Sequence, residues 1–322
     1  EVEHAVILVV GGEIEVEAAD APVLAHDDRP LEPVLQLAHV ARPAIGVDRR
    51  QRLGGKRHRL SAPLGGGTGD EVLAGTLPGG RFRSRASGES WQLDMGLWNQ
   101  PKRPEWFGGG YPEPGIHSIC PHPDGSLLVG VSCAGAWATG DGGATWRQTA
   151  HGMRADFMPP EQADDPDIQD PHSIVRCAAQ PQVLWCQHHC GIWRSIDGAA
   201  SWQEVTGVPV AAFGFAVGVH PADPQTAWFV PAVKDERRVP VDGALVVNRT
   251  RDGGRSFETL RHGLPQSDCY DLVYRHGLAV GGAGHSLMMG STTGHLWASD
   301  DGGDRWSTVA AHLPPIYAVK FG

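Results

Sequence analysis

The chain has 322 residues, of which 41% are hydrophobic and 43 are glycine, and its formal net charge is −10. A chain of this length and composition can form one large all-β domain. The acidic charge argues against nucleic acids and anionic membranes as partners, and the absence of a long apolar run argues against a membrane span.

The first part of the chain has an unusual composition. Residues 1–81 contain no Phe, Trp or Tyr, and all aromatic residues lie from Phe82 onward. We therefore divide the chain into an atypical N-terminal segment, residues 1–60, and a repeat domain, residues 61–322. Two interpretations of the first segment stay open. Residues 5–18 form a hairpin that belongs to the closing unit of the fold, or the segment is not native sequence and packs poorly.

A 21-residue pattern is repeated along the rest of the chain. Its copies are Glu71–Trp91, Ser126–Trp146, Gln182–Trp202 and Ser286–Trp306, and a fifth copy, Gln225–Phe257, carries twelve extra residues in its middle turn. Each copy has two apolar runs around a Gly-containing turn, which predicts a β-hairpin. The terminal aromatic residues recur about every 50–55 residues, a period typical of repeat architectures.

Further apolar runs precede the hairpins and follow the aromatic residues. The preceding runs begin at His117-Ser-Ile119, His172-Ser-Ile174, Phe215-Ala-Val217, Asp271-Leu-Val273 and Tyr317-Ala-Val319. Each repeat then holds four antiparallel strands, and such units at this period predict an all-β fold, the β-propeller. The C-terminal strand Ile316–Phe321 would close the ring together with the N-terminal strands.

The second strand of each hairpin enters a segment of the form [S/T]-x-D-x-G-x-[S/T]-[W/F]. Its aspartates are Asp141, Asp197, Asp252 and Asp301. We interpret them as structural, because the same group recurs in every repeat whereas an active site needs only one set. The carboxylate would accept hydrogen bonds from amides one or two residues ahead. Ala86, Ala199 and Arg305 depart from the pattern, so the turns that contain them should be weaker.

These segments resemble Asp-box (BNR) repeats, which occur in sialidases, sortilin-type receptors, xyloglucanase-like hydrolases and photosystem II assembly-factor-like propellers. The span from about Gly75 to Gly322 resembles bacterial sialidase-like or BNR-repeat glycosyl hydrolases. This resemblance rests on the stretches GTLPGGRFRS, WFGGGYPEPGIHSI, MRADFMP, RTRDGGRSF and GSTTGHLWASDDGG. It implies a ring of six or seven blades and says little about reaction.

The order of strands predicts where a ligand would bind. The aspartate segments lie between the third and fourth strands, so the long connections between repeats and the turns inside the hairpins share the opposite face, where binding sites are usually built. Aromatic rings and cations there suit sugars or other flat ligands. The candidate ligand-binding residues are Trp106, Tyr111, His117, His172, His188, His189, Arg237, Arg238 and Arg275.

We expect no cofactor and no metal ion. His188, His189 and Cys190 lie in one turn beside His172, but no C-x-x-C or H-E-x-x-H spacing supports a zinc site. The acidic run Asp164, Asp165, Asp167 and Asp170 is more typical of a solvated surface than of a calcium site.

Three functions fit the sequence, and we favour the first. The first is a non-catalytic propeller that binds a small molecule, a glycan or a protein partner. The second is a glycoside hydrolase. A sialidase-like enzyme would use arginines such as Arg154 for the substrate carboxylate, Tyr274 or Tyr111 as nucleophile and Asp156 as acid. A two-carboxylate enzyme would use Asp156 and Asp235. The sialidase Arg-Ile-Pro segment is absent.

The third is an assembly-factor-like scaffold, for which the basic cluster Arg49–Arg59 is the only candidate patch. The six cysteines show no compact disulfide framework, so we expect buried free thiols in a reducing cytoplasm. We also expect a monomer. A leader lost before Glu1 would instead make the protein secreted.

Overall fold

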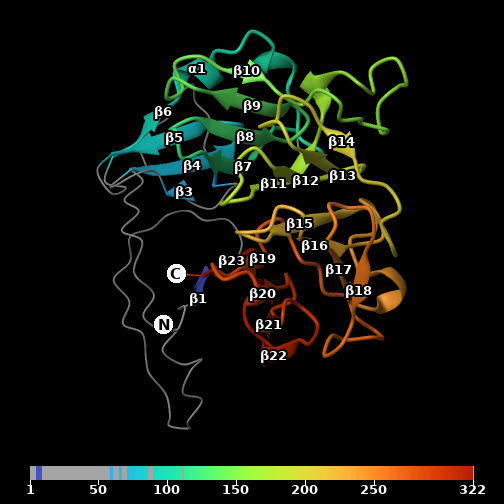
Figure 1. Ribbon diagram of the computed structural model, residues 1–322. Helices are drawn as coiled ribbons and strands as arrows, with labels where there is room; N and C mark the ends of the chain where they lie inside the picture. Colours follow the sequence, from blue (N-terminus) through green and yellow to red (C-terminus); the bar gives the residue numbers. More distant parts are fainter. Residues whose placement is uncertain are drawn as a thin grey trace.

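The computed structural model describes residues 5–8, 59–60, 65–66, 71–85, 90–110 and 112–321. Among these residues almost every regular element is a strand (Figure 1). The helical elements are α1 (Met95–Trp98) and three 3-10 turns, η2 (Arg103–Glu105), η3 (Pro166–Ile168) and η4 (Val241–Gly243). The predicted all-β class is therefore confirmed. No helix in the described part of the chain is long and apolar enough to cross a membrane.

Five antiparallel sheets follow one another along the chain. Sheet 1 contains β2 (Arg59–Leu60), β3 (Gly65–Gly66), β4 (Val72–Leu77), β5 (Arg81–Ser84) and β6 (Gln92–Leu93). Sheet 2 contains β7 (Ile116–Pro121), β8 (Leu127–Val131), β9 (Gly135–Thr139) and β10 (Arg147–Gln148). Sheet 3 contains β11 (Pro171–Arg176), β12 (Leu184–His188), β13 (Gly191–Ser195) and β14 (Gln203–Glu204).

Sheets 4 and 5 have the same four-stranded order. Sheet 4 contains β15 (Gly214–Val219), β16 (Ala227–Pro231), β17 (Val247–Thr250) and β18 (Glu258–Leu260). Sheet 5 contains β19 (Leu278–Val280), β20 (Leu287–Gly290), β21 (Leu296–Ser299) and β22 (Ser307–Ala310). In sheet 1, β2 and β3 both pair with β4, at opposite ends of that strand, and together take the place of a first strand.

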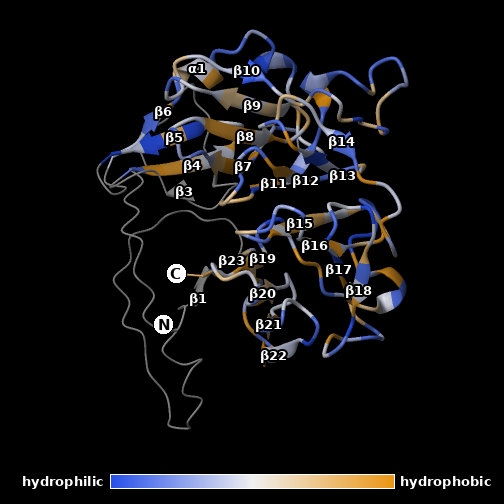
Figure 2. Ribbon diagram, in the orientation of Figure 1, coloured by the Kyte–Doolittle hydropathy of each residue, from blue (hydrophilic) through white to orange (hydrophobic). Residues whose placement is uncertain are grey.

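The core lies between neighbouring sheets. The first strands β7, β11, β15 and β19 pack side by side, with β4 beside β7 and β23 (Ala318–Phe321) beside β19. Each large hydrophobic cluster joins two sheets; Trp228 of β16 and Trp297 of β21, for example, share one cluster and are each 1% exposed. Figure 2 shows that the inner strands differ from the outer ones. Hydrophobic residues lie along β4 and β8, whereas hydrophilic residues lie along the outer strands β10 and β14. This radial packing around β7, β11, β15 and β19 is the predicted arrangement.

The two ends of the chain meet in a separate two-stranded sheet. Strand β1 (Ala5–Leu8) pairs antiparallel with β23, from Ala5 opposite Phe321 to Leu8 opposite Ala318. The predicted pairing of an N-terminal strand with the C-terminal strand is thus present. The second strand of the predicted hairpin, residues 13–18, lies outside the described residues, as does most of the segment 1–60. The number of blades stays a prediction.

One predicted strand is wrong. Asp271-Leu-Val273 is not the first strand of sheet 5; that place belongs to β19, which begins seven residues after Asp271 and pairs with β20. Asp271 instead accepts hydrogen bonds from the Ser291 hydroxyl at 2.6 Å and from Nδ1 of His295 at 2.8 Å. These bonds hold the segment in the connection before β19.

Candidate functional site

The long connections between sheets and the turns inside the hairpins lie at one end of the sheets. We call this end the loop face, and the opposite end, which carries the turns between third and fourth strands, the turn face. Because β7, β11, β15 and β19 pack side by side, their first residues meet near the centre of the loop face.

Three of these strands begin with a β-bulge. The extra residue is His117 in β7 and His172 in β11, and the equivalent irregularity in β15 includes Phe215. A bulge redirects the side chain that it carries and is common next to functional sites. The repeat therefore presents side chains from three sheets at this centre.

His172 lies between a carboxylate and a carbonyl group. Its Nε2 is 3.6 Å from Oδ2 of Asp170, and the same oxygen is 3.5 Å from Nδ1 of His189. Its Nδ1 is 2.7 Å from the carbonyl oxygen of Gly214. A carbonyl oxygen can only accept, so Nδ1 of His172 carries the proton and donates it. The side chains of Asp170 and His172 are both 3% exposed, whereas that of His189 is 21% exposed.

Burial controls the charge of this cluster. It lowers the pKa of His172, and it lowers the pKa of His117 well below the usual value, with Arg275 adding to the second shift. Burial raises the pKa of Asp170, but the neighbouring imidazoles of His172 and His189 outweigh it and hold that pKa well below its usual value. Asp170 is thus an ionised carboxylate at neutral pH. It can bind a cation but cannot protonate a leaving group.

Several buried polar atoms at this centre have no partner among the described residues. They are Nδ1 of His117, Oδ1 of Asp170, Nε of Arg275 and Nε2 of His276. The four groups are neighbours, because Arg275, Asp170 and His276 all shift the pKa of His117. Buried polar groups in folded proteins nearly always have a partner, so each exception needs an explanation. A bound ligand or ordered water is the ordinary one.

Aromatic rings and two arginines adjoin the cluster. The rings of His172, Phe215 and Tyr274 form a stack, with centroids 4.5 Å and 4.8 Å apart. The guanidinium of Arg275 lies 4.6 Å from the Tyr274 ring, and that of Arg238 lies 5.3 Å from the Phe215 ring. Both arginines and Tyr274 are half-buried. The loop face therefore combines positive charge with aromatic surface near its centre.

The two carboxylates considered for catalysis are each bound by an arginine. Asp156 accepts from Nε of Arg154 at 2.7 Å, and Arg154 also binds Asp164. Both groups of that pair are well exposed. Asp235 accepts from Nε of Arg238 at 3.0 Å, in the connection between β16 and β17.

The remaining predicted ligand-binding residues are placed differently. Trp106 is 6% exposed and packs against Trp137 with ring centroids 5.4 Å apart, so it faces the core instead of the solvent. His188 is fully buried, and its Nε2 accepts from the N–H of Asp170 at 2.9 Å. Burial lowers the pKa of His188 to about 3. Arg237 is exposed, and Tyr111 lies outside the described residues.

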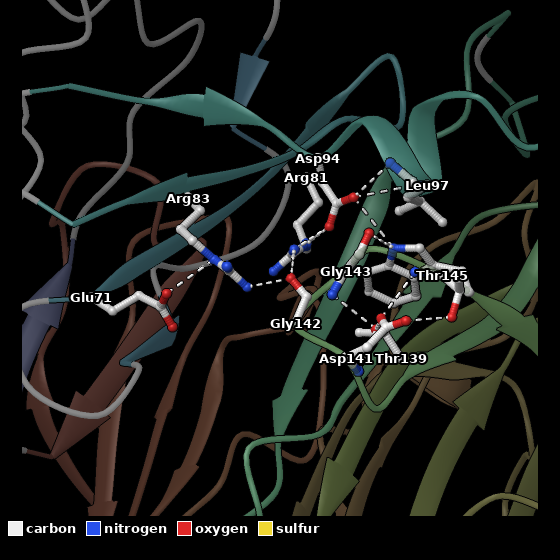
Figure 3. Close-up of polar contacts among 12 residues, drawn as sticks. Glu71, Arg81, Arg83, Asp94, Leu97, Thr139, Asp141, Gly142, Gly143 and Thr145 are labelled. Atoms are coloured by element: carbon white, nitrogen blue, oxygen red, sulfur yellow. Dashed lines mark hydrogen bonds and ion pairs between the residues drawn. The ribbon is translucent and has the colours of Figure 1, made fainter.

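On the turn face, each of the four aspartates closes its own turn. We call these the aspartate turns, and Figure 3 shows that of Asp141. Oδ1 of Asp141 accepts from the N–H of Thr145 at 2.9 Å, and Oδ2 accepts from the Thr145 hydroxyl at 2.6 Å. The Thr139 hydroxyl also donates to Oδ1, at 2.8 Å. The expectation of an amide one or two residues ahead is wrong. The bound amide lies four residues ahead because the carboxylate spans the whole turn.

The turns of Asp197 and Asp252 repeat this pattern. Asp301 binds the N–H of Arg305 at 2.9 Å but has no hydroxyl partner at that position, because an arginine replaces the Ser/Thr. Ala199, which replaces a Gly, adopts a φ of 70° in its turn, and its N–H donates to the Ser195 hydroxyl at 2.9 Å. Ala86 lies outside the described residues.

Arginines on third strands bind the aspartate turn of the following sheet. Arg83 on β5 donates to the carbonyl of Gly142 at 2.6 Å, and its Nε lies 3.0 Å from Glu71 (Figure 3). Arg249 on β17 donates to Gly302 at 2.8 Å. The aspartate turns thus connect neighbouring sheets on the face opposite the candidate site.

Comparisons with known proteins support the fold. No family model and no curated protein matches the chain. An ancestral GH74 enzyme shares 17% identity at a TM-score of 0.56, over 79% of this chain and 33% of that one. The GH74 xyloglucanase from Xanthomonas campestris shares 17% identity at 0.52, over 75% and 37%. The extracellular domain of a hybrid two-component system from B. thetaiotaomicron shares 12% identity at 0.51, over 82% and 32%.

The chain has a β-propeller fold. It spans about a third of the length of these propeller proteins. Identities this low show the shared fold alone.

Sequence reasoning missed the role of Asp170. The acidic run that contains it was interpreted as solvated surface, and Asp164 and Asp165 are indeed exposed. Asp170 itself is 2% exposed, because it immediately precedes β11 at the centre of the loop face. Its position two residues before His172, which begins a predicted first strand, is the signal that could have set it apart.

Proposed function

We propose that this β-propeller belongs to the Asp-box (BNR-repeat) type and is a binding protein for an anionic saccharide, held at the centre of the loop face. The observation that carries the proposal is the group of buried, unpartnered polar atoms on His117, Asp170, Arg275 and His276. They come from β7 and from the connections that precede β11 and β19, and they converge where the first strands meet. A rigid scaffold that gathers such groups is typical of a ligand site.

The neighbouring side chains favour an anionic and partly apolar ligand. Arg275 supplies positive charge that can pair with a carboxylate or sulfate group, whereas Arg238 is already paired with Asp235. Tyr274 and Phe213 are half-buried rings beside them, and ring faces and edges suit the apolar face of a sugar. GH74 propellers of the same fold include a xyloglucanase, which adds weight to a saccharide ligand.

A binding experiment tests this proposal. Titration calorimetry would compare 3′-sialyllactose with a neutral β-glucan oligosaccharide. We expect saturable binding of the sialylated sugar, weakened at least tenfold, or about 1.4 kcal/mol, by Arg275→Ala. Arg305→Ala is the matched control, since Arg305 is exposed on the turn face. Equal binding by both variants would place the ligand elsewhere.

A glycoside hydrolase is the second candidate, because Asp156 and Asp235 both lie on the loop face of a fold shared with GH74 enzymes. Each carboxylate is already paired with an arginine, Arg154 or Arg238, which argues for binding over catalysis. Turnover of aryl sialosides or β-glucan oligomers would decide for the enzyme if either Asp156→Asn or Asp235→Asn abolishes that turnover.

A scaffold function would need a basic patch for a protein partner. The side chains of the Arg49–Arg59 cluster lie outside the described residues, so this alternative stays a prediction from the sequence.

A further inference from the structure

We propose that Asp170, His172 and His189 form a binding site for a divalent transition-metal ion, with Zn²⁺ the ion that fits it best. Each residue offers one ligand atom, and the three atoms all lie within 4.8 Å of one another. One carboxylate oxygen and two imidazole nitrogens are a common donor set for such ions in proteins.

The spacing of the atoms matches a tetrahedral ion. Bonds of 2.0–2.1 Å at the tetrahedral angle place neighbouring ligand atoms about 3.4 Å apart. Oδ2 of Asp170 lies 3.6 Å from Nε2 of His172 and 3.5 Å from Nδ1 of His189. Both distances are too long for good hydrogen bonds, whose donor and acceptor lie about 2.7–3.2 Å apart. Both distances leave room for a small cation bound to all three atoms.

The hydrogen bonding of His172 points the same way. Its Nδ1–H donates to the carbonyl of Gly214, which leaves the lone pair of Nε2 directed toward Asp170. A lone pair that faces a carboxylate is repelled unless a cation or proton lies between them. Histidine ligands of metal ions almost always donate their other N–H to a carbonyl or carboxylate in this way, which fixes the ring for the metal.

Local backbone structure brings the three residues together without the metal. The β-bulge turns His172 toward Asp170, two residues earlier. The N–H of His189, in the turn between β12 and β13, donates to the carbonyl oxygen of Asp170 at 3.0 Å. The ring of His189 is held edge-on by Phe157 and Phe213, with centroids 5.1 Å and 5.7 Å away. Ligands fixed in advance lose little conformational freedom on binding.

The site is also reachable. The side chains of Asp170 and His172 are nearly buried, but that of His189 is 21% exposed and lies toward the surface. Three protein ligands leave a fourth position of a tetrahedral ion for water or for another donor.

Calorimetric titration of the full chain with Zn²⁺, without an affinity tag and after chelator treatment, tests the proposal. The variants are Asp170→Asn and His189→Ala, and the control is His151→Ala, since His151 is exposed. We expect one saturable site whose affinity falls at least tenfold in both variants and is unchanged in the control. Circular dichroism and urea unfolding show that each variant is folded; if Asp170→Asn is not, His189→Ala carries the test.

Substitution by Co²⁺ gives a second measurement, because a four-coordinate Co²⁺ ion absorbs visible light intensely. The Co²⁺-loaded wild-type protein should show this absorption, and the His189→Ala variant should lose it. The absence of saturable Zn²⁺ binding below about 100 μM, or equal affinity in wild type and both variants, would overturn the proposal. Either result leaves the saccharide proposal standing, because that test uses sugars and Arg275.

Discussion

Nη1 of Arg249 on β17 donates a hydrogen bond to the carbonyl oxygen of Gly302, 2.8 Å away in the aspartate turn of the next sheet. The same oxygen accepts from Nε1 of Trp228 at 2.8 Å. The Arg249 side chain is 3% exposed and also pairs with Glu258 and Asp304. A buried cation thus joins sheets 4 and 5 on the turn face.

Replacement of Arg249 by Met should destabilise the propeller. The variant keeps most of the buried stem but loses the bonds of the guanidinium to Gly302, Glu258 and Asp304. We expect the free energy of unfolding to fall by about 2 kcal/mol, because Trp228 still satisfies Gly302 and the two carboxylates can return to water. Urea denaturation measures the change. The exposed Arg251→Met should stay within about 0.5 kcal/mol, and equal effects of the two variants would show that the link between sheets contributes nothing.

The aspartate turns should give the stability a dependence on acid pH. The hydrogen bond from the Ser256 hydroxyl, with that from its N–H, lowers the pKa of Asp252 from 3.8 to about 2. A depressed folded-state pKa adds stability that is complete above the unfolded pKa and is lost as the pH falls through the folded one. The difference in unfolding free energy between wild type and Asp252→Asn should therefore shrink between about pH 4 and pH 2. Chemical denaturation across this range measures it, and a constant difference would contradict the assignment.

Gly109 should be required for metal binding. A Cβ on this residue would lie 2.7 Å from Oδ2 of Asp170, the oxygen assigned to the metal. Gly109 has no positive φ, so its backbone accepts alanine and the collision is with the carboxylate. We expect Gly109→Ala to weaken Zn²⁺ binding at least tenfold in calorimetry. Gly140→Ala, whose Cβ would meet nothing within 4 Å, is the control. Unchanged affinity in Gly109→Ala would move the metal away from Oδ2.

Removal of residues 1–8 should lower the melting temperature and favour association. Strand β1 pairs with β23 along Ala318–Phe321, so its loss leaves β23 with an unpaired edge. Exposed strand edges pair with other chains. Differential scanning calorimetry and light scattering measure the two effects. A shortened chain as stable and monodisperse as the full one would show that β1 does not contribute to ring closure.

The repeat made most of the fold predictable. The regular spacing of apolar runs, Gly turns and aspartates indicated four-stranded sheets, and hairpins such as β8–β9 lie where expected. The first strand of sheet 5 was not predictable, because Asp271–Val273 and Leu278–Val280 are both short apolar runs. Only tertiary contacts of Asp271 with Ser291 and His295 separate them.

The candidate site was predictable only in part. The topology indicated the correct strand ends for His117 and His172. The sequence contains no sign of the bulges that redirect these residues, since a bulge is a property of pairing between strands. Burial of Asp170 was hidden for a similar reason, because its exposed neighbours Asp164 and Asp165 give the run the composition of a surface loop.

Hydrogen exchange with and without 3′-sialyllactose tests most directly whether ligands bind at the centre of the loop face. We expect slower amide exchange in the segments 108–110, 112–118, 170–173, 213–216 and 274–277, with no change in the aspartate turns. Slower exchange confined to the aspartate turns, or no change in any segment at millimolar sugar, would contradict it.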